Sequence, residues 1–132
     1  MQESDAKTSN QILSVLVIDD EEMIRELARD VLEMNGFTTL CAENGMQGVA
    51  TYEEHREKIG CIILDLTMPE MSGLETYSKL KEINTDVKII LSTGHGRDRD
   101  AQEIIARGVL GVIQKPYRIE ELVLRVRETL TM

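Results

Sequence analysis

Short apolar runs alternate with longer amphipathic segments along almost the whole chain, and this alternation restricts the fold more than any other feature of the sequence. The five apolar runs lie at 15–18, 37–42, 61–66, 87–91 and 109–113. They have the length of strands rather than of surface helices. The run Cys61-Ile62-Ile63-Leu64 has no polar alternation, which is typical of a strand that is buried on both faces.

An amphipathic segment follows each apolar run. These segments predict helices over 21–34, around 46–50, over 72–83, over 101–107, and over a last segment that ends near residue 130. The apolar residues expected on the inner faces of these helices are Ile24, Leu27, Ala28 and Val31, then Met46, Val49 and Ala50, then Ile104 and Ile105, and finally Ile119, Leu122, Val123, Val126 and Leu130. Asn35-Gly36 and Gly108 are expected to end two of the helices, and the stretch from Ser72 to Glu75 has the spacing of a capping box.

Strands that alternate with helices are joined by right-handed crossovers and form a parallel sheet with helices on both faces. The sequence therefore predicts an α/β fold, a flavodoxin-like (βα)5 doubly wound sheet of five parallel strands in the order 2-1-3-4-5. The domain is expected to cover residues 12–132, after a flexible polar tail at 1–11. In such a sheet, ligands bind beyond the carboxyl ends of the strands, where the strand order reverses.

The charge and the distribution of apolar residues exclude several classes of protein. The net charge of −9 argues against a nucleic-acid-binding surface and against binding to anionic membranes. No apolar run is long enough to span a bilayer, and residues 1–11 lack the apolar core of a secretory signal. We therefore expect a cytosolic protein in which Cys41 and Cys61 are buried free thiols.

Polar and charged residues stand where the expected strands end. Asp19 and Asp20 follow the first strand, Asp65 ends the third, Thr93 follows the fourth and Lys115 follows the fifth. Two carboxylates about 4 Å apart repel each other by roughly 4 kcal/mol at an effective dielectric constant of 20. Three of them therefore need protonation or a cation, and Mg²⁺ suits them because it takes oxygen ligands and accepts phosphate oxygens.

Each of these residues also has a simpler interpretation. Acidic residues are common in the first turn of a helix, which is the expected role of Glu21 and Glu22 and an alternative role for Asp19 and Asp20. Asp65 is different, because an aspartate directly after Ile62-Ile63-Leu64 would be costly to bury unless it served a site. The joint position of these groups at one edge of the sheet favours a functional site.

Four stretches of the sequence resemble the receiver (response-regulator) domains of two-component phosphorelays. They run from Val15 to Glu21, from Leu64 to Gly73, from Ser92 to Gly94 and from Gln114 to Tyr117. The resemblance covers nearly the whole chain and implies that Asp65 is the phosphoacceptor. The metal ligands that it implies for Mg²⁺ are Asp19, Asp20, Asp65 and the backbone carbonyl of Thr67. It also implies that Thr93 and Lys115 bind the phosphoryl group.

The resemblance further implies what the domain acts with. The phosphoryl donor would be a phosphohistidine of a sensor histidine kinase or a phosphotransfer protein, and the domain itself would be no enzyme beyond self-phosphorylation and self-dephosphorylation. The surface formed by the helix over 101–107, the fifth strand and the last helix would be the partner or homodimer contact. The ending from Val112 to Leu122 looks most like receivers attached to hybrid histidine kinases, so the chain would be either stand-alone or part of such a kinase.

Four residues depart from the usual pattern of that family. Val112 stands where many receivers carry an aromatic residue, and Arg118 replaces the usual capping residue before the last helix. Thr67 and His95 occupy positions that tune the lifetime of the acyl phosphate, and neither is the commonest residue there.

Three other classes of protein fit the sequence less well. A phosphatase with an aspartate nucleophile, of the haloacid-dehalogenase type, would have a second acid where Thr67 stands. A flavodoxin-type binder would need a phosphate loop where Asp19-Asp20-Glu21-Glu22 would repel phosphate, and the aromatic content of 3% offers little to stack on a flavin. A pure interaction module would not need the full set of reactive residues.

Overall fold

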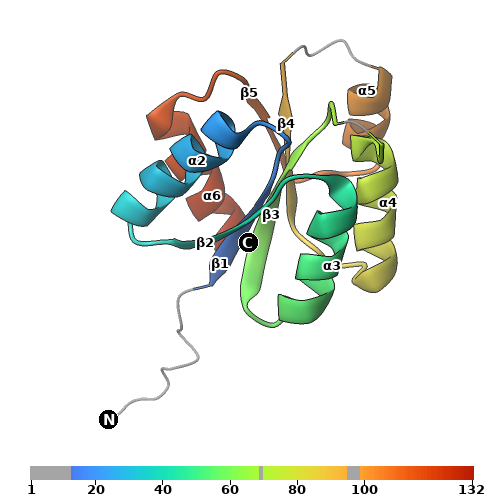
Figure 1. The fold of residues 1–132 in the computed structure, drawn as a ribbon, viewed down its shortest axis with the longest axis horizontal. Coiled ribbons are helices and arrows are strands. Elements are labelled where there is room, and N and C mark those ends of the chain that lie inside the picture. Colours follow the sequence, from blue (N-terminus) through green and yellow to red (C-terminus); the bar gives the residue numbers. More distant parts are fainter. Residues whose placement is uncertain (1–12, 69, 95–98) are drawn as a thin grey trace.

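A computed structural model describes residues 13–68, 70–94 and 99–132 and places five parallel strands in one sheet (Figure 1). The order is β2-β1-β3-β4-β5, which confirms the predicted order 2-1-3-4-5. The strands are β1 (Ser14–Ile18), β2 (Thr38–Ala42), β3 (Ile59–Asp65), β4 (Ile89–Thr93) and β5 (Gly111–Gln114).

Helices cover both faces of the sheet (Figure 1). They are α2 (Glu22–Met34), α3 (Gly45–His55), α4 (Gly73–Ile83), α5 (Arg99–Ala106) and α6 (Ile119–Leu130). Helices α2 and α6 pack together on one face, whereas α3, α4 and α5 form a continuous layer on the other. In the part of the chain that the structure describes, none of the helices has the length and apolar content of a transmembrane span.

The two faces have separate apolar cores, and successive residues of each central strand alternate between them. Ile62 and Leu64 of β3 belong to the core under α3, α4 and α5, and Ile63 belongs to the core under α2 and α6. All three side chains are fully buried. Because both faces of the strand are covered, a run without polar alternation is stable here, with roughly 1.5–3 kcal/mol gained for each such side chain.

The predicted helix ends are present. Gly36 and Gly108 follow α2 and α5 with φ angles of +93° and +95°, a conformation that favours glycine. The Ser72 hydroxyl accepts a hydrogen bond of 3.1 Å from the backbone N–H of Glu75 at the start of α4. The Asn44 side chain likewise accepts one of 2.7 Å from the N–H of Gln47 at the start of α3.

Two strands begin elsewhere than predicted. β4 begins at Ile89 rather than at 87, and β3 begins at Ile59 rather than at 61, whereas β5 lies largely within the predicted run 109–113. Val87 is buried although it lies outside the ladder, because apolar residues mark burial and not backbone pairing. The shift matters for function, since it makes Thr93 the last residue of β4 rather than part of the following loop.

Several apolar side chains expected on inner helix faces are exposed instead. They are Leu27, Met46, Ala50, Ile105 and Ile119. Leu32 of α2, which the prediction left out, is fully buried. The side chains that meet the sheet form a narrower stripe than the apolar residues in the sequence suggest, because neighbouring residues of a helix point about 100° apart.

Both cysteines are free thiols, as predicted, but only Cys61 is fully buried. Burial raises the pKa of the Cys61 thiol to about 12, so it stays protonated and unreactive. Cys41 is partly buried and packs against the core under α2 and α6.

Gly73, at the start of α4, packs closely against the backbone of Leu66. A Cβ atom at Gly73 would lie 2.7 Å from both the Cα and the carbonyl oxygen of Leu66, and backbone atoms cannot rotate away. We expect Gly73→Ala to lower the free energy of unfolding by about 1–3 kcal/mol. Urea denaturation should show this loss, whereas the control Gly111→Ala, whose nearest contact is at 3.8 Å, should be close to neutral. Equal stability of the two variants would contradict this packing.

Candidate functional site

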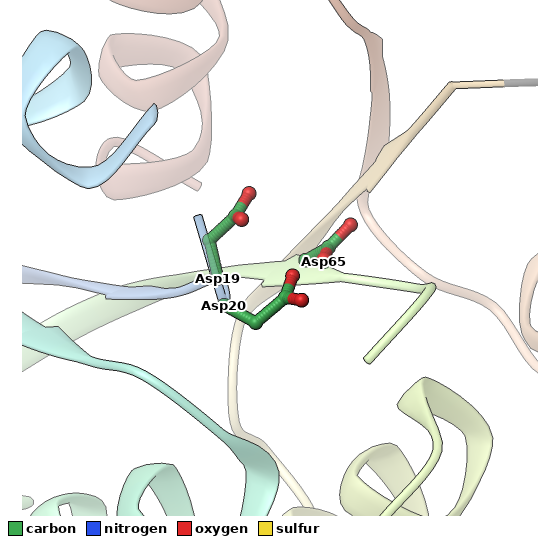
Figure 2. Close-up of side chains that lie close together, drawn as sticks. All are labelled: Asp19, Asp20 and Asp65. Atoms are coloured by element: carbon green, nitrogen blue, oxygen red, sulfur yellow. The ribbon is translucent and has the colours of Figure 1, made fainter. Parts of the chain in front are cut away.

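The predicted site residues gather at the carboxyl edge of the sheet. Asp19 and Asp20 directly follow β1, Asp65 is the last residue of β3, and Lys115 directly follows β5. Figure 2 shows the three aspartate side chains close together, with one carboxylate oxygen of each within 4.8 Å of those of the others. The strand order reverses between β1 and β3, so the site lies where doubly wound sheets place their ligands.

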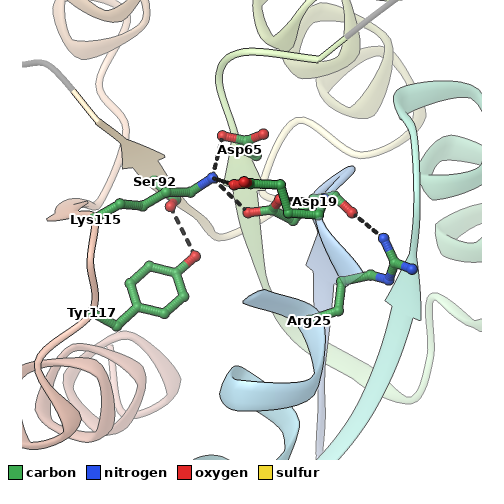
Figure 3. Close-up of polar contacts among 7 residues, drawn as sticks. Asp19, Arg25, Asp65, Ser92, Lys115 and Tyr117 are labelled. Carbon is green, nitrogen blue, oxygen red and sulfur yellow. Dashed lines mark hydrogen bonds and ion pairs between the residues drawn. The ribbon is translucent and has the colours of Figure 1, made fainter. Parts of the chain in front are cut away.

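The ammonium group of Lys115 joins these carboxylates. Its Nζ atom lies 2.9 Å from Oδ2 of Asp19 and 3.1 Å from Oδ1 of Asp65 (Figure 3). The side chains of Asp19 and Asp65 are only 1% and 3% exposed, so these ion pairs are shielded from water. The backbone N–H of Lys115 donates a 2.9 Å hydrogen bond to the carbonyl of Thr93, which anchors the lysine to the end of β4.

The carboxylates of the site carry more negative charge than Lys115 neutralises, and the pKa shifts follow from this excess and from burial. Burial and then the charge of Asp19 raise the pKa of Asp65 to about 7, and the contacts with Lys115 only partly oppose this. Burial also raises the pKa of Asp19 above its ordinary value. For Lys115, burial lowers the pKa, but the contacts with Asp19 and Asp65 outweigh that effect and raise it. One ammonium therefore does not balance the carboxylates around it.

A divalent cation fits this arrangement. The Oδ2 atom of Asp65 is buried and has no hydrogen-bond partner among the residues that the structure describes. A buried carboxylate oxygen without a partner is costly, and the neighbouring carboxylates of Asp19 and Asp20 supply only further oxygen acceptors. Such an oxygen-only set of ligands suits Mg²⁺ rather than a softer metal.

Backbone contacts hold Asp19 in place. The backbone N–H of Glu21 donates a 2.9 Å hydrogen bond to Oδ1 of Asp19. The Arg25 guanidinium donates one of 2.8 Å to the Asp19 carbonyl (Figure 3). Arg25 was not predicted as part of the site. Its position one helical turn after the acidic residues was the available signal, since a first-turn side chain can reach back to the strand end.

Two contacts around Lys115 were not predicted from the sequence. The carboxylate of Glu21 lies 3.3 Å from the Lys115 ammonium, so Glu21 does more than favour the helix terminus. The hydroxyl groups of Tyr117 and Ser92 are 2.8 Å apart and buried, which ties the segment after Lys115 to β4 (Figure 3). Burial raises the pKa of Tyr117 to about 12, so its hydroxyl remains a neutral hydrogen-bonding group.

Four other residues named from the sequence lie within the described ranges. Thr93 is 4% exposed at the end of β4, and Thr67 is exposed two residues after Asp65. Val112 is partly buried against the core under α3, α4 and α5. Arg118 stands at the N-terminus of α6 and makes no side-chain capping hydrogen bond. His95 lies outside the described residues.

Comparisons with known proteins agree with one another. The family model described as "Response regulator receiver domain" matches residues 15–127. Chemotaxis protein CheY of Bacillus subtilis is 32% identical over 117 residues, which are 88% of this chain and 96% of CheY. Transcriptional regulatory protein SrrA of Staphylococcus aureus is 35% identical over 116 residues, which are 88% of this chain but only 47% of SrrA.

A solved structure gives the same answer. A receiver domain protein from Clostridium thermocellum superposes with a TM-score of 0.85 and 28% identity, over 91% of this chain and 95% of that one. The chain spans nearly all of CheY and about half of SrrA, so it corresponds to one domain of the longer regulator. The fold, the acidic edge of the sheet and these matches together show that the chain belongs to the response-regulator receiver domains of two-component systems.

Proposed function

We propose that the chain takes a phosphoryl group onto Asp65 in a Mg²⁺-dependent reaction and changes conformation in response. Receiver domains interact with histidine kinases or phosphotransfer proteins, and a phosphohistidine of such a partner would be the donor. The observation that carries the proposal is the state of Asp65, whose Oδ1 pairs with Lys115 while its buried Oδ2 has no hydrogen-bond partner in the described ranges. The carboxylate is thus fixed by Lys115 through one oxygen and keeps lone pairs that no donor among the described residues occupies, as both a metal ligand and a phosphoacceptor require.

The chemistry is an in-line displacement at phosphorus. A carboxylate oxygen of Asp65 forms the new P–O bond, and the P–N bond to the donor histidine breaks, so that the imidazole leaves and takes up a proton. The Lys115 ammonium lies 3.1 Å from the Asp65 carboxylate and would neutralise charge on the phosphoryl oxygens. The Thr93 hydroxyl, at the end of β4, would bind the same group after transfer.

Mg²⁺ would be held by Asp19, Asp20 and Asp65, together with the backbone carbonyl of Thr67. When bound, the ion supplies positive charge that the site lacks. The three carboxylates contribute −3 and Lys115 contributes +1, so a divalent cation makes this group neutral and lets the aspartates stay ionised. A neutral site can accept an anionic phosphoryl group, whereas the site with Lys115 alone would repel it.

In this role the chain is a stoichiometric phosphoacceptor and not a turnover enzyme. The phosphatase alternative is weakened further by the family match and by Thr67, which occupies the place of its second acid. Attachment to a hybrid histidine kinase, the absence of a nucleic-acid contact and a location in the cytoplasm stay predictions.

Magnesium binding should stabilise the fold. A thermal melt at saturating Mg²⁺ should have a higher midpoint than a metal-free melt, because the ion binds only the folded arrangement. The free energy of unfolding should rise by about 2.7 kcal/mol at a hundredfold excess of Mg²⁺ over the Kd. Asp20→Asn should remove most of this gain. The control Asp30→Asn makes the same charge change at an exposed position of α2 and should keep it. A midpoint that does not respond to Mg²⁺ would contradict the metal site.

Phosphorylation can be tested with a small donor. Incubation with acetyl phosphate and Mg²⁺ should add one phosphoryl group, seen by intact mass and removed by hydroxylamine, as expected for an acyl phosphate. Asp65→Asn should abolish the addition. Lys115→Ala should lower its rate at least tenfold, which is about 1.4 kcal/mol in activation free energy, because a charged partner of the phosphoryl group is lost. Asp86→Asn, at an exposed position outside the site, should behave as wild type. Phosphate that survives Asp65→Asn would show that the assignment is wrong.

A route for the signal leads from the phosphoryl group to the surface formed by α5, β5 and α6. Phosphorylation adds about −1.5 to −2 charge, which attracts Lys115 and the Thr93 hydroxyl. Thr93 ends β4 and pairs in register with Gln114 of β5, so its movement reaches the neighbouring strand directly. Val112 of β5 is partly buried and small, which suggests a looser coupling than an aromatic residue would give. This surface is our candidate for a partner or homodimer contact.

Thr93→Ala should separate phosphorylation from this response. The variant should still take up the phosphoryl group, since Asp65 and Lys115 are intact. It should lose the amide shifts that phosphorylation causes between residues 99 and 126, because the hydroxyl that moves is missing. NMR spectra with and without the phosphodonor measure both proteins. Shifts that persist in Thr93→Ala, or that appear around 46–52 instead, would exclude this route.

A further inference from the structure

The Lys115 ammonium has three carboxylate neighbours and no more than three hydrogens to donate. Its Nζ lies 2.9 Å from Asp19, 3.1 Å from Asp65 and 3.3 Å from Glu21. In the unphosphorylated protein, carboxylate oxygens of three residues therefore lie around the ammonium. A phosphoryl group on Asp65 must compete with these neighbours for it.

The three carboxylates differ in how easily the phosphoryl group can replace them at the Lys115 ammonium. Asp19 and Asp65 are 1% and 3% exposed, and Asp19 is held further by the N–H of Glu21. The Glu21 side chain is 62% exposed and makes the longest of the three contacts. An exposed ion pair is weak because water screens it and the long side chain loses rotamer freedom, whereas a buried carboxylate that loses its cation is left uncompensated. Glu21 is therefore the partner that costs least to displace.

We propose that Glu21 is a positioning residue that holds Lys115 in the unphosphorylated site and competes with the phosphoryl group for it. The inference rests on the proposed phosphorylation of Asp65 and adds a residue that sets how readily the site accepts a phosphoryl group. Phosphorylation replaces the contact between Lys115 and Glu21 by one between Lys115 and a phosphoryl oxygen, and it releases the Glu21 side chain to solvent. Glu21 thus restrains phosphorylation by small anionic donors.

Glu21→Gln tests the competition, and the chain offers a matched control. Glu22 is the next residue, is also exposed at the start of α2, and makes no ion pair with Lys115 among the described residues. Glu22→Gln changes the net charge equally without touching the ammonium. Both variants and the wild type are compared as full chains at saturating Mg²⁺, so that a difference in metal affinity does not enter.

Two measurements are made on each protein. The first is the initial rate of phosphorylation at low acetyl phosphate concentration, and the second is the affinity for beryllium trifluoride, a phosphoryl mimic, from the shift of the thermal midpoint. Glu21→Gln should raise both by about two- to fivefold, the range expected for loss of an exposed ion pair. Glu22→Gln should change neither by more than about 1.5-fold, because screening weakens a charge that lies off the site.

The possible outcomes separate the two proposals. An unchanged or lower rate and affinity in Glu21→Gln would overturn the competition while leaving phosphorylation of Asp65 intact. An equal rise in both variants would overturn it as well, because the effect would then be one of overall charge. If the wild type takes up no phosphoryl group, or Asp65→Asn still does, the proposed function itself is wrong and this inference falls with it.

Discussion

The ion pairs of Lys115 with the buried carboxylates of Asp19 and Asp65 are the interaction on which the site depends. They join the ends of β1 and β3 to the segment after β5, across the carboxyl edge of the sheet. Without the ammonium, two carboxylates at such separations would repel each other by several kcal/mol, roughly 4 kcal/mol at 4 Å and an effective dielectric of 20. A buried charge that loses its partner is strongly destabilising, so the lysine is structural as well as chemical.

The surrounding contacts keep this lysine where it is. Its backbone N–H is bonded to Thr93, and the hydrogen bond between Tyr117 and Ser92 fastens the next part of the segment to β4. Ser92 is paired in register with Asp65, so the same stretch of β4 supports both Asp65 and Lys115. These contacts fix the backbone around Asp65 and Lys115, and a fixed backbone positions the carboxylate for a reaction.

The outer part of the site is different. Asp20 and Glu21 are exposed, and each contributes a negative charge at the entrance. We infer opposite roles for these two neighbours, since Asp20 would hold the metal that makes phosphorylation favourable, while Glu21 would occupy the cation that the phosphoryl group needs. Adjacent residues can differ in this way because the chain turns from β1 into α2 at this point and directs their side chains to different neighbours.

The architecture and most of the site could be predicted from the sequence. The alternation of apolar runs with amphipathic segments predicts the doubly wound sheet, and parallel strands bring Asp19, Asp65 and Lys115 to one edge whatever the details of packing. These features are local patterns combined with a topological rule, so they can be read without coordinates. The limits of β4 and the exposure of Leu27 could not be predicted in this way. An apolar residue type shows that a side chain is hydrophobic, but it does not show which neighbour covers that side chain.

The way in which the charged groups pair with one another could not be predicted from the sequence. The contact between Glu21 and Lys115 joins residues 94 positions apart, and that between Ser92 and Tyr117 spans 25 positions. Neither has a sequence pattern, because a side-chain contact across a sheet edge depends on strand register and rotamers that distant residues set together. The sequence identified the carboxylates and the lysine. Only the folded chain showed that Asp65 has a buried oxygen without a hydrogen-bond partner in the described ranges, and that Glu21 and Asp65 both contact the Lys115 ammonium.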